Sequence, residues 1–205
     1  MGSPERIGNL FYCSSMLERK TYGMYNELSQ KVDDADIKPT LVIIAQDSLK
    51  HCNLFEEISK DLISKNPREK SCKTNFGKTW KHIEEITKLV KQKKSLNEEE
   101  FFEIINRLAF IENSLGEEYS TLEKTKMLRY MDKEISEKYS IDFNSKKDIL
   151  DSIISDEEQH INYLLEIYEK LKNKHPKMKS QPEFKYQNPD AWWIPNHSQK
   201  TEHVI

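Results

Sequence analysis

The sequence predicts an all-α protein built as a bundle of helices, and three observations carry this prediction. Apolar residues recur every three or four positions in four segments, which is the pattern of helices with one buried face. The 205 residues include only 5 Gly, too few for the turns of β-sandwiches, barrels and dinucleotide-binding folds. Hydrophobic residues make up 36% and charged residues 33% of the chain, so apolar side chains must gather on narrow faces to form a core.

The four periodic segments span residues 7–32, 41–62, 101–122 and 150–171. Breaker residues follow the first two, at Asp33-Asp34 and Asn66-Pro67. The third follows Ser95-Leu96-Asn97-Glu98, a capping-box pattern, and the fourth ends before Pro176. Because a charged, helix-forming stretch continues to residue 139, the third helix is either long or broken near Gly116.

About thirty residues connect the second helix to the third. They contain a short amphipathic stretch with Trp80, Ile83, Ile86, Leu89 and Val90, which predicts a crossover helix. A connection of this length lets the third helix run parallel to the second. The sequence therefore predicts a four-helix bundle with one long crossover between its second and third helices.

The two halves of the chain repeat a common plan. Overlaying the fourth helix on the second with a shift of 109 matches all seven positions of the buried face. Overlaying the third on the first with a shift of 94 also aligns their apolar positions. The aligned polar residues are His51 with His160, Ser48 with Glu157, Glu18 with Glu112 and Tyr25 with Tyr119.

Five metal-capable side chains lie on these apolar faces, namely Glu18, His51, Glu112, Glu157 and His160. An ionised carboxylate in a core costs several kcal/mol unless it is paired or binds a metal. We expect the five to converge at the middle of the bundle, with the two histidine side chains within about 10 Å of each other. A single buried Glu or His is more often a hydrogen-bonded core residue, so a bundle without metal remains the alternative.

These residues resemble the ferritin-like diiron-carboxylate superfamily, nearest in plan to the four-helix domain of rubrerythrin, over about residues 5–173. The resemblance implies that Glu18 and Glu112 are terminal ligands, that Glu157 bridges two metals, and that His51 and His160 each cap one metal. Iron is the metal that the resemblance implies. The oxygen and imidazole ligands by themselves also suit Mn²⁺ or Zn²⁺.

The chain departs from the family pattern at Ser48, which stands where a second bridging Glu is expected. A serine hydroxyl is a poor iron ligand, so either the neighbouring Asp47 or a water would fill this position. With three carboxylates instead of four, the site would hold one metal, or two with a bridging hydroxide.

Two functions from different classes follow. The first is an oxidoreductase that activates O₂ or peroxide, of peroxidase or ferroxidase type, or an iron-handling protein. Its electrons would come from another protein, because the three cysteines form no C-x-x-C pair, and a homodimer is the expected assembly. The second is a metal-free bundle that acts as a binding or scaffold module through its C-terminal tail.

The domain expected for residues 1–175 is the bundle, and residues 176–205 form an aromatic and proline-containing tail. Trp192 and Trp193 in this tail are expected to pack on the bundle or on a partner. The net charge of −3 offers no broad positive surface for nucleic acid. The absence of a long apolar run and of a secretory leader predicts a cytoplasmic protein without a membrane span, whose cysteines, including Cys13 and Cys52, are free thiols.

Overall fold

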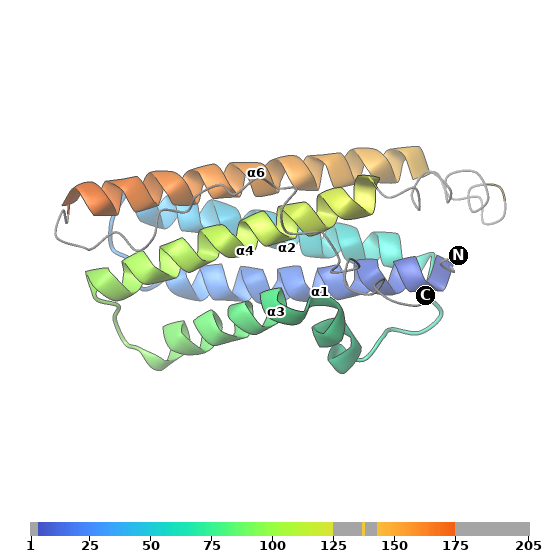
Figure 1. Cartoon of the computed structure of the whole chain (residues 1–205), viewed down its shortest axis with the longest axis horizontal. Coiled ribbons are helices and arrows are strands. Elements are labelled where there is room, and N and C mark those ends of the chain that lie inside the picture. The colour runs from blue at the N-terminus through green and yellow to red at the C-terminus, as the bar shows by residue number, and fades with distance from the viewer. Residues whose placement is uncertain (1–3, 125–136, 138–142, 175–205) are drawn as a thin grey trace, which may run out of the picture.

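Four long helices form a bundle, and a fifth lies in the connection between the second and the third of them. The computed structural model of the protein describes residues 4–124, 137 and 143–174, in which there is no strand (Figure 1). The bundle consists of α1 (Pro4–Ser29), α2 (Ile37–Lys60), α4 (Glu98–Lys124) and α6 (Phe143–Lys174). The crossover contains α3 (Glu69–Gln92). The predicted all-α bundle with a long crossover is therefore confirmed.

The bundle is made of two helical hairpins. Helix α1 packs along α2 and α4 packs along α6, while α2 also contacts α6 and joins the two pairs. The colour gradient in Figure 1 shows that α2 and α4 run in the same direction, opposite to α1 and α6. This is the direction that the long crossover predicts. Helix α3 lies against α1 and also touches α4.

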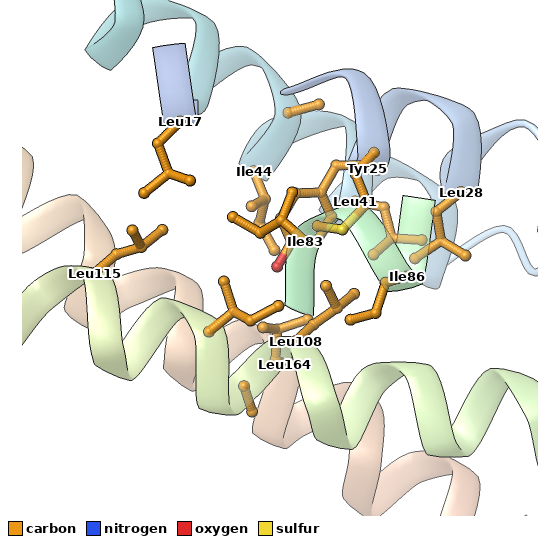
Figure 2. Close-up of a cluster of buried hydrophobic side chains, with 14 of the residues drawn as sticks. Leu17, Tyr25, Leu28, Leu41, Ile44, Ile83, Ile86, Leu108, Leu115 and Leu164 are labelled. Carbon is orange, nitrogen blue, oxygen red and sulfur yellow. The ribbon is translucent and has the colours of Figure 1, made fainter. Parts of the chain in front are cut away.

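The core is formed by the apolar faces that the sequence periodicity identifies. Each of the five helices in the described part of the chain contributes side chains to it, so α3 is part of the core and not only a connection. Trp80, the largest fully buried side chain, comes from α3. Figure 2 labels members of this cluster from each helix: Leu17, Tyr25, Leu28, Leu41, Ile44, Ile83, Ile86, Leu108, Leu115 and Leu164.

Local hydrogen bonds set the start of α4, two residues after the predicted position. The backbone N–H of Glu100 donates to Asn97 Oδ1 (2.9 Å), and the N–H of Asn97 donates to Glu100 Oε2 (3.3 Å). The capping box is therefore formed by Asn97 and Glu100 rather than by Ser95 and Glu98. Helix α4 continues through Gly116 to Lys124 without a break, so the helix is not broken near Gly116. The rest of the charged stretch, residues 125–136, lies outside the described residues.

The crossover helix is longer than predicted and carries a disulfide. Gly77, with φ of 44°, lies at a kink inside α3, in a conformation that glycine adopts without a Cβ clash. Cys72 in the first part of α3 is bonded to Cys13 of α1, with Cα atoms 4.9 Å apart. The expectation of three free thiols is therefore wrong for these two residues, whereas Cys52 is a free, buried thiol. Their separation of 59 residues gave no local signal for the pairing.

None of the helices in residues 4–124 and 143–174 combines the length and the apolar content that a bilayer-spanning helix requires. The tail expected at residues 176–205, with Trp192 and Trp193, lies outside the described residues. Its predicted docking on the bundle stays a prediction.

Candidate metal centre

The structure brings all five predicted ligands together in the interior of the bundle. Each of them is at most 1% exposed. They form two groups that share Glu157, one with Glu18 and His51 and the other with Glu112 and His160. In each group, one ligand atom from every residue lies within 4.8 Å of the others. The ring centroids of the two histidines are 5.9 Å apart, inside the expected limit.

The same periodicity that buries the apolar side chains also buries these polar ones. Glu18 on α1 lies seven residues from both Phe11 and Tyr25, which are core residues on the same helix face. Glu157 and His160 on α6 are three residues apart, so they share one face a turn apart. Because the apolar face of each bundle helix is turned to the centre of the bundle, polar residues at equivalent levels on the four helices meet there.

Glu157 lies between the two histidines. Its Oε1 is 3.0 Å from His51 Nδ1, and its Oε2 is 3.7 Å from His160 Nδ1. His160 Nδ1 is also 3.2 Å from Glu112 Oε2. Both imidazole Nδ1 atoms therefore face carboxylates, and the Glu157 carboxylate is positioned to serve both halves of the site.

Two tyrosines hold the terminal carboxylates across the bundle. The Tyr25 hydroxyl on α1 donates to Glu112 Oε1 on α4 at 2.6 Å. The Tyr119 hydroxyl on α4 donates in turn to Glu18 Oε1 on α1. Both tyrosines are fully buried. These hydrogen bonds between hairpins fix the orientation of each Glu, a role that the sequence did not reveal.

A second layer of charged residues contacts the outer nitrogen of each histidine. His51 Nε2 is 3.0 Å from Asp156 Oδ2, and His160 Nε2 is 3.4 Å from Asp47 Oδ2. Lys50 Nζ touches both aspartates, at 2.6 Å from Asp156 and 3.3 Å from Asp47. Metal-binding histidines generally donate their other N–H to such a carboxylate.

Asp47 was expected as an extra metal ligand, but the structure places it at the outer nitrogen of His160. Neither of the two potential metal-binding groups includes it. Asp156 was not recognised from the sequence at all. The signal was present, because the shift of 109 that aligns His51 with His160 also aligns Asp47 with Asp156.

Burial raises the pKa values of the Glu18 and Glu157 carboxylates. Burial, together with the charge of Glu157, raises the pKa of Glu18 to about 8. Burial and the charge of Glu112 raise the pKa of Glu157 well above its usual value. In the metal-free protein, burial and the repulsion between neighbouring carboxylates therefore both favour the protonated forms of Glu18 and Glu157.

His160 and Glu112 form the charged pair of the metal-free site. Burial by itself would lower the pKa of His160, but the hydrogen bond to Glu112 and the nearby carboxylates of Glu112 and Glu157 outweigh it and raise the pKa to about 11. Burial would likewise raise the pKa of Glu112, but the hydrogen bond and charge of His160 outweigh it and lower the pKa. His160 is thus one of the groups whose proton a metal would displace.

The donor atoms of the site fit a bound cation. Among the described residues, Glu18 Oε2, His51 Nδ1 and both carboxylate oxygens of Glu157 are buried without a hydrogen-bond partner. The 3.0 Å contact between His51 and Glu157 does not have hydrogen-bond geometry. Because buried polar atoms are almost always satisfied, orphaned atoms facing one another call for a missing partner. A divalent ion would satisfy all four.

Comparison of the chain with protein-family models, with curated proteins and with solved structures found no match. The family suggested by the ligand pattern is therefore argued from the site alone.

Removing either tyrosine hydroxyl should destabilise the metal-free protein. In Tyr119→Phe, Glu18 loses the partner of Oε1 while its Oε2 already lacks one, so we expect a loss of about 1–3 kcal/mol. Tyr25→Phe should cost less, because Glu112 keeps its contact with His160. Urea denaturation measures both, with the half-buried Tyr22→Phe as the control. Equal stability of all three variants and the wild type would contradict these roles.

Proposed function

We propose that the chain is a ferritin-like, nonhaem metal-carboxylate protein that binds iron at this site. The observation that carries the proposal is the pair of Glu/His groups that share Glu157 and contain four buried donor atoms without partners. The plan of a Glu on α1 and α4 and a His on α2 and α6 supports the resemblance to the rubrerythrin-like bundles.

The two halves of the site would each hold one ion. Glu18 and His51 belong to one half, Glu112 and His160 to the other, and Glu157 lies between them. In the metal-bound protein, Asp47 and Asp156 would accept from the outer Nε2–H of the histidines, which would leave Nδ1 as the ligand atom. Metal binding requires deprotonated ligands, so it must displace the protons held on Glu18, Glu157 and His160.

Bound iron would supply electron exchange with O₂ or peroxide, which is the chemistry of a peroxidase, a ferroxidase or an iron-handling protein. The chain excludes bulk water from this centre, orients the histidines through the aspartates and orients the terminal carboxylates through the tyrosines. Oxygen and imidazole donors also accept Mn²⁺ or Zn²⁺. An external electron donor, a homodimer and a cytoplasmic location stay predictions from the sequence and the resemblance.

Metal should stabilise the chelator-treated protein. At a free Fe²⁺ or Mn²⁺ concentration about 100 times Kd, binding to the folded state adds about 2.7 kcal/mol. For a chain of this size this corresponds to a rise in Tm of about 5–10 °C. Thermal unfolding under anaerobic conditions, together with the metal content of the purified protein, measures the effect.

His160→Ala should abolish this gain, whereas His82→Ala should retain it. His82 is a suitable control because it is 37% exposed and pairs with Glu85 on α3, away from the site. A wild-type protein that binds no metal and gains no stability from it would contradict the proposal. That result would favour the metal-free scaffold function, which the sequence assigns to the C-terminal tail.

A further inference from the structure

The two halves of the site match side chain for side chain, except at one position of α2. Each histidine contacts an aspartate on the helix of the other histidine, and each terminal Glu accepts from a tyrosine of the other hairpin. Ser48 stands where the repeat places Glu157 on α6. The matched pairs are Glu18 with Glu112, His51 with His160, Asp47 with Asp156 and Tyr25 with Tyr119.

Ser48 supplies neither charge nor a free ligand atom. It lies three residues before His51, on the same helix face, and is 1% exposed. Its hydroxyl donates to the backbone carbonyl of Ile44 at 3.0 Å, so it is used within α2. The neighbouring Asp47 does not take its place, because it contacts His160 Nε2 and Lys50 at the edge of the site.

The protein therefore supplies too little negative charge to balance two metal ions at this site. Its buried carboxylates are Glu18, Glu112 and Glu157, whose three negative charges face the four positive charges of two divalent ions. Asp47 and Asp156 are each 29% exposed and share Lys50, so solvent screens their contribution. An uncompensated charge in an apolar interior is costly, so a site with two metal ions needs one more monoanion. That monoanion is either a bridging hydroxide or a bound carboxylate, and the salt comparison below separates the two.

We propose that the metal-loaded protein binds a small monocarboxylate beside Ser48, as the ligand that replaces the carboxylate missing from α2. This inference rests on the proposed function and names an additional ligand of the same site. Serine lacks the carboxylate and one methylene of glutamate, so an anion of the size of formate or acetate is the matching class. The burial of Ser48, which is 1% exposed, likewise favours a small anion over a large one.

Metal titration of the chelator-treated full chain in formate and in chloride, at equal ionic strength, tests the proposal. In formate we expect at least about tenfold tighter Mn²⁺ or Fe²⁺ binding, which equals about 1.4 kcal/mol, and a stoichiometry closer to two ions per chain. Calorimetry and the metal-dependent Tm report both quantities without any assay of activity. Ser48→Ala should respond to formate as the wild type does.

Ser48→Glu should bind metal with the raised stoichiometry in chloride alone and should no longer respond to formate, because its own carboxylate takes the position. If this variant does not fold, a second anion gives the same information, since acetate must also tighten metal binding relative to chloride in the wild type. Equal metal binding in formate and chloride would overturn the inference while leaving the proposed function intact. Absence of metal binding in both salts would instead remove the proposed function.

Discussion

Glu157→Leu should stabilise the metal-free protein and abolish its response to metal. The Glu157 carboxylate is 1% exposed, and neither of its oxygens has a hydrogen-bond partner. Burial and the charge of Glu112 also raise its pKa, which shows that the ionised form is poorly accommodated. Leucine would occupy this buried position without that cost.

The expected gain for Glu157→Leu is about 1–3 kcal/mol, the cost of burying a polar group whose hydrogen bonds are not made. For a chain of this size the Tm should rise by about 2–4 °C per kcal/mol. Glu157→Gln is the matched control: it should also lose metal binding, but without the gain, because its amide still has to be buried. A Glu157→Leu variant less stable than the metal-free wild type would show that Glu157 supports the fold instead of straining it.

The metal-free protein should lose stability as the pH rises from about 4.5 to 8. Folding raises the pKa of Glu18 from its ordinary value of 4.5 to about 8, chiefly through burial. Between these values the folded state keeps a proton that the unfolded state has released, so the free energy of unfolding falls by about 1.4 kcal/mol per pH unit. Glu157, with its raised pKa, adds to the same slope.

His160 extends this trend to higher pH, because its pKa rises from 6.5 to about 11 in the folded state. Glu112 has the opposite effect on stability, and only at acidic pH. Because folding lowers its pKa, its stabilising contribution is lost as the pH falls below 4.5. Urea denaturation across pH 5–8 measures the slope. Glu118, whose pKa burial also raises to about 8, contributes independently, so Glu118→Gln is needed as the background.

With metal bound the pH dependence should reverse. Metal competes with protons for Glu18, Glu157 and His160, so metal affinity rises with pH and the loaded protein gains stability over the same range. Opposite slopes for the metal-free and loaded protein would link the perturbed carboxylates directly to metal binding. A metal-free protein whose stability does not change with pH would contradict the burial of protonated Glu18 and Glu157.

The helices could be predicted because their information is local. Apolar residues recur every three or four positions in each segment. Helix geometry places them on one face, whatever the rest of the chain does. Helix ends were less certain. The capping box formed at Asn97 and Glu100, because hydrogen-bond geometry selected one of two overlapping polar patterns. The continuity of α4 through Gly116 depended on packing, which a local pattern does not contain.

Candidate ligands could also be found from the sequence, since Glu and His at positions otherwise filled by Leu, Ile and Phe carry a cost that needs a reason. The internal repeat also aligns these residues between the two hairpins, which predicts that they lie at the same height in the bundle. The role of Asp156 at His51 and the bonds between tyrosines and carboxylates were not recognised, because each joins residues on different helices.

The sequence by itself determined the helical class, the crossover and the burial of Glu18, His51, Glu112, Glu157 and His160, because spacing along one helix decides which side chains share a face. Only the tertiary structure decided that Cys13 bonds to Cys72, that Asp47 contacts a histidine instead of joining the metal-binding groups, and which donor atoms remain without partners. These features depend on distances of a few ångströms between helices. Such distances follow from how the whole core packs, and no periodicity within one helix records them.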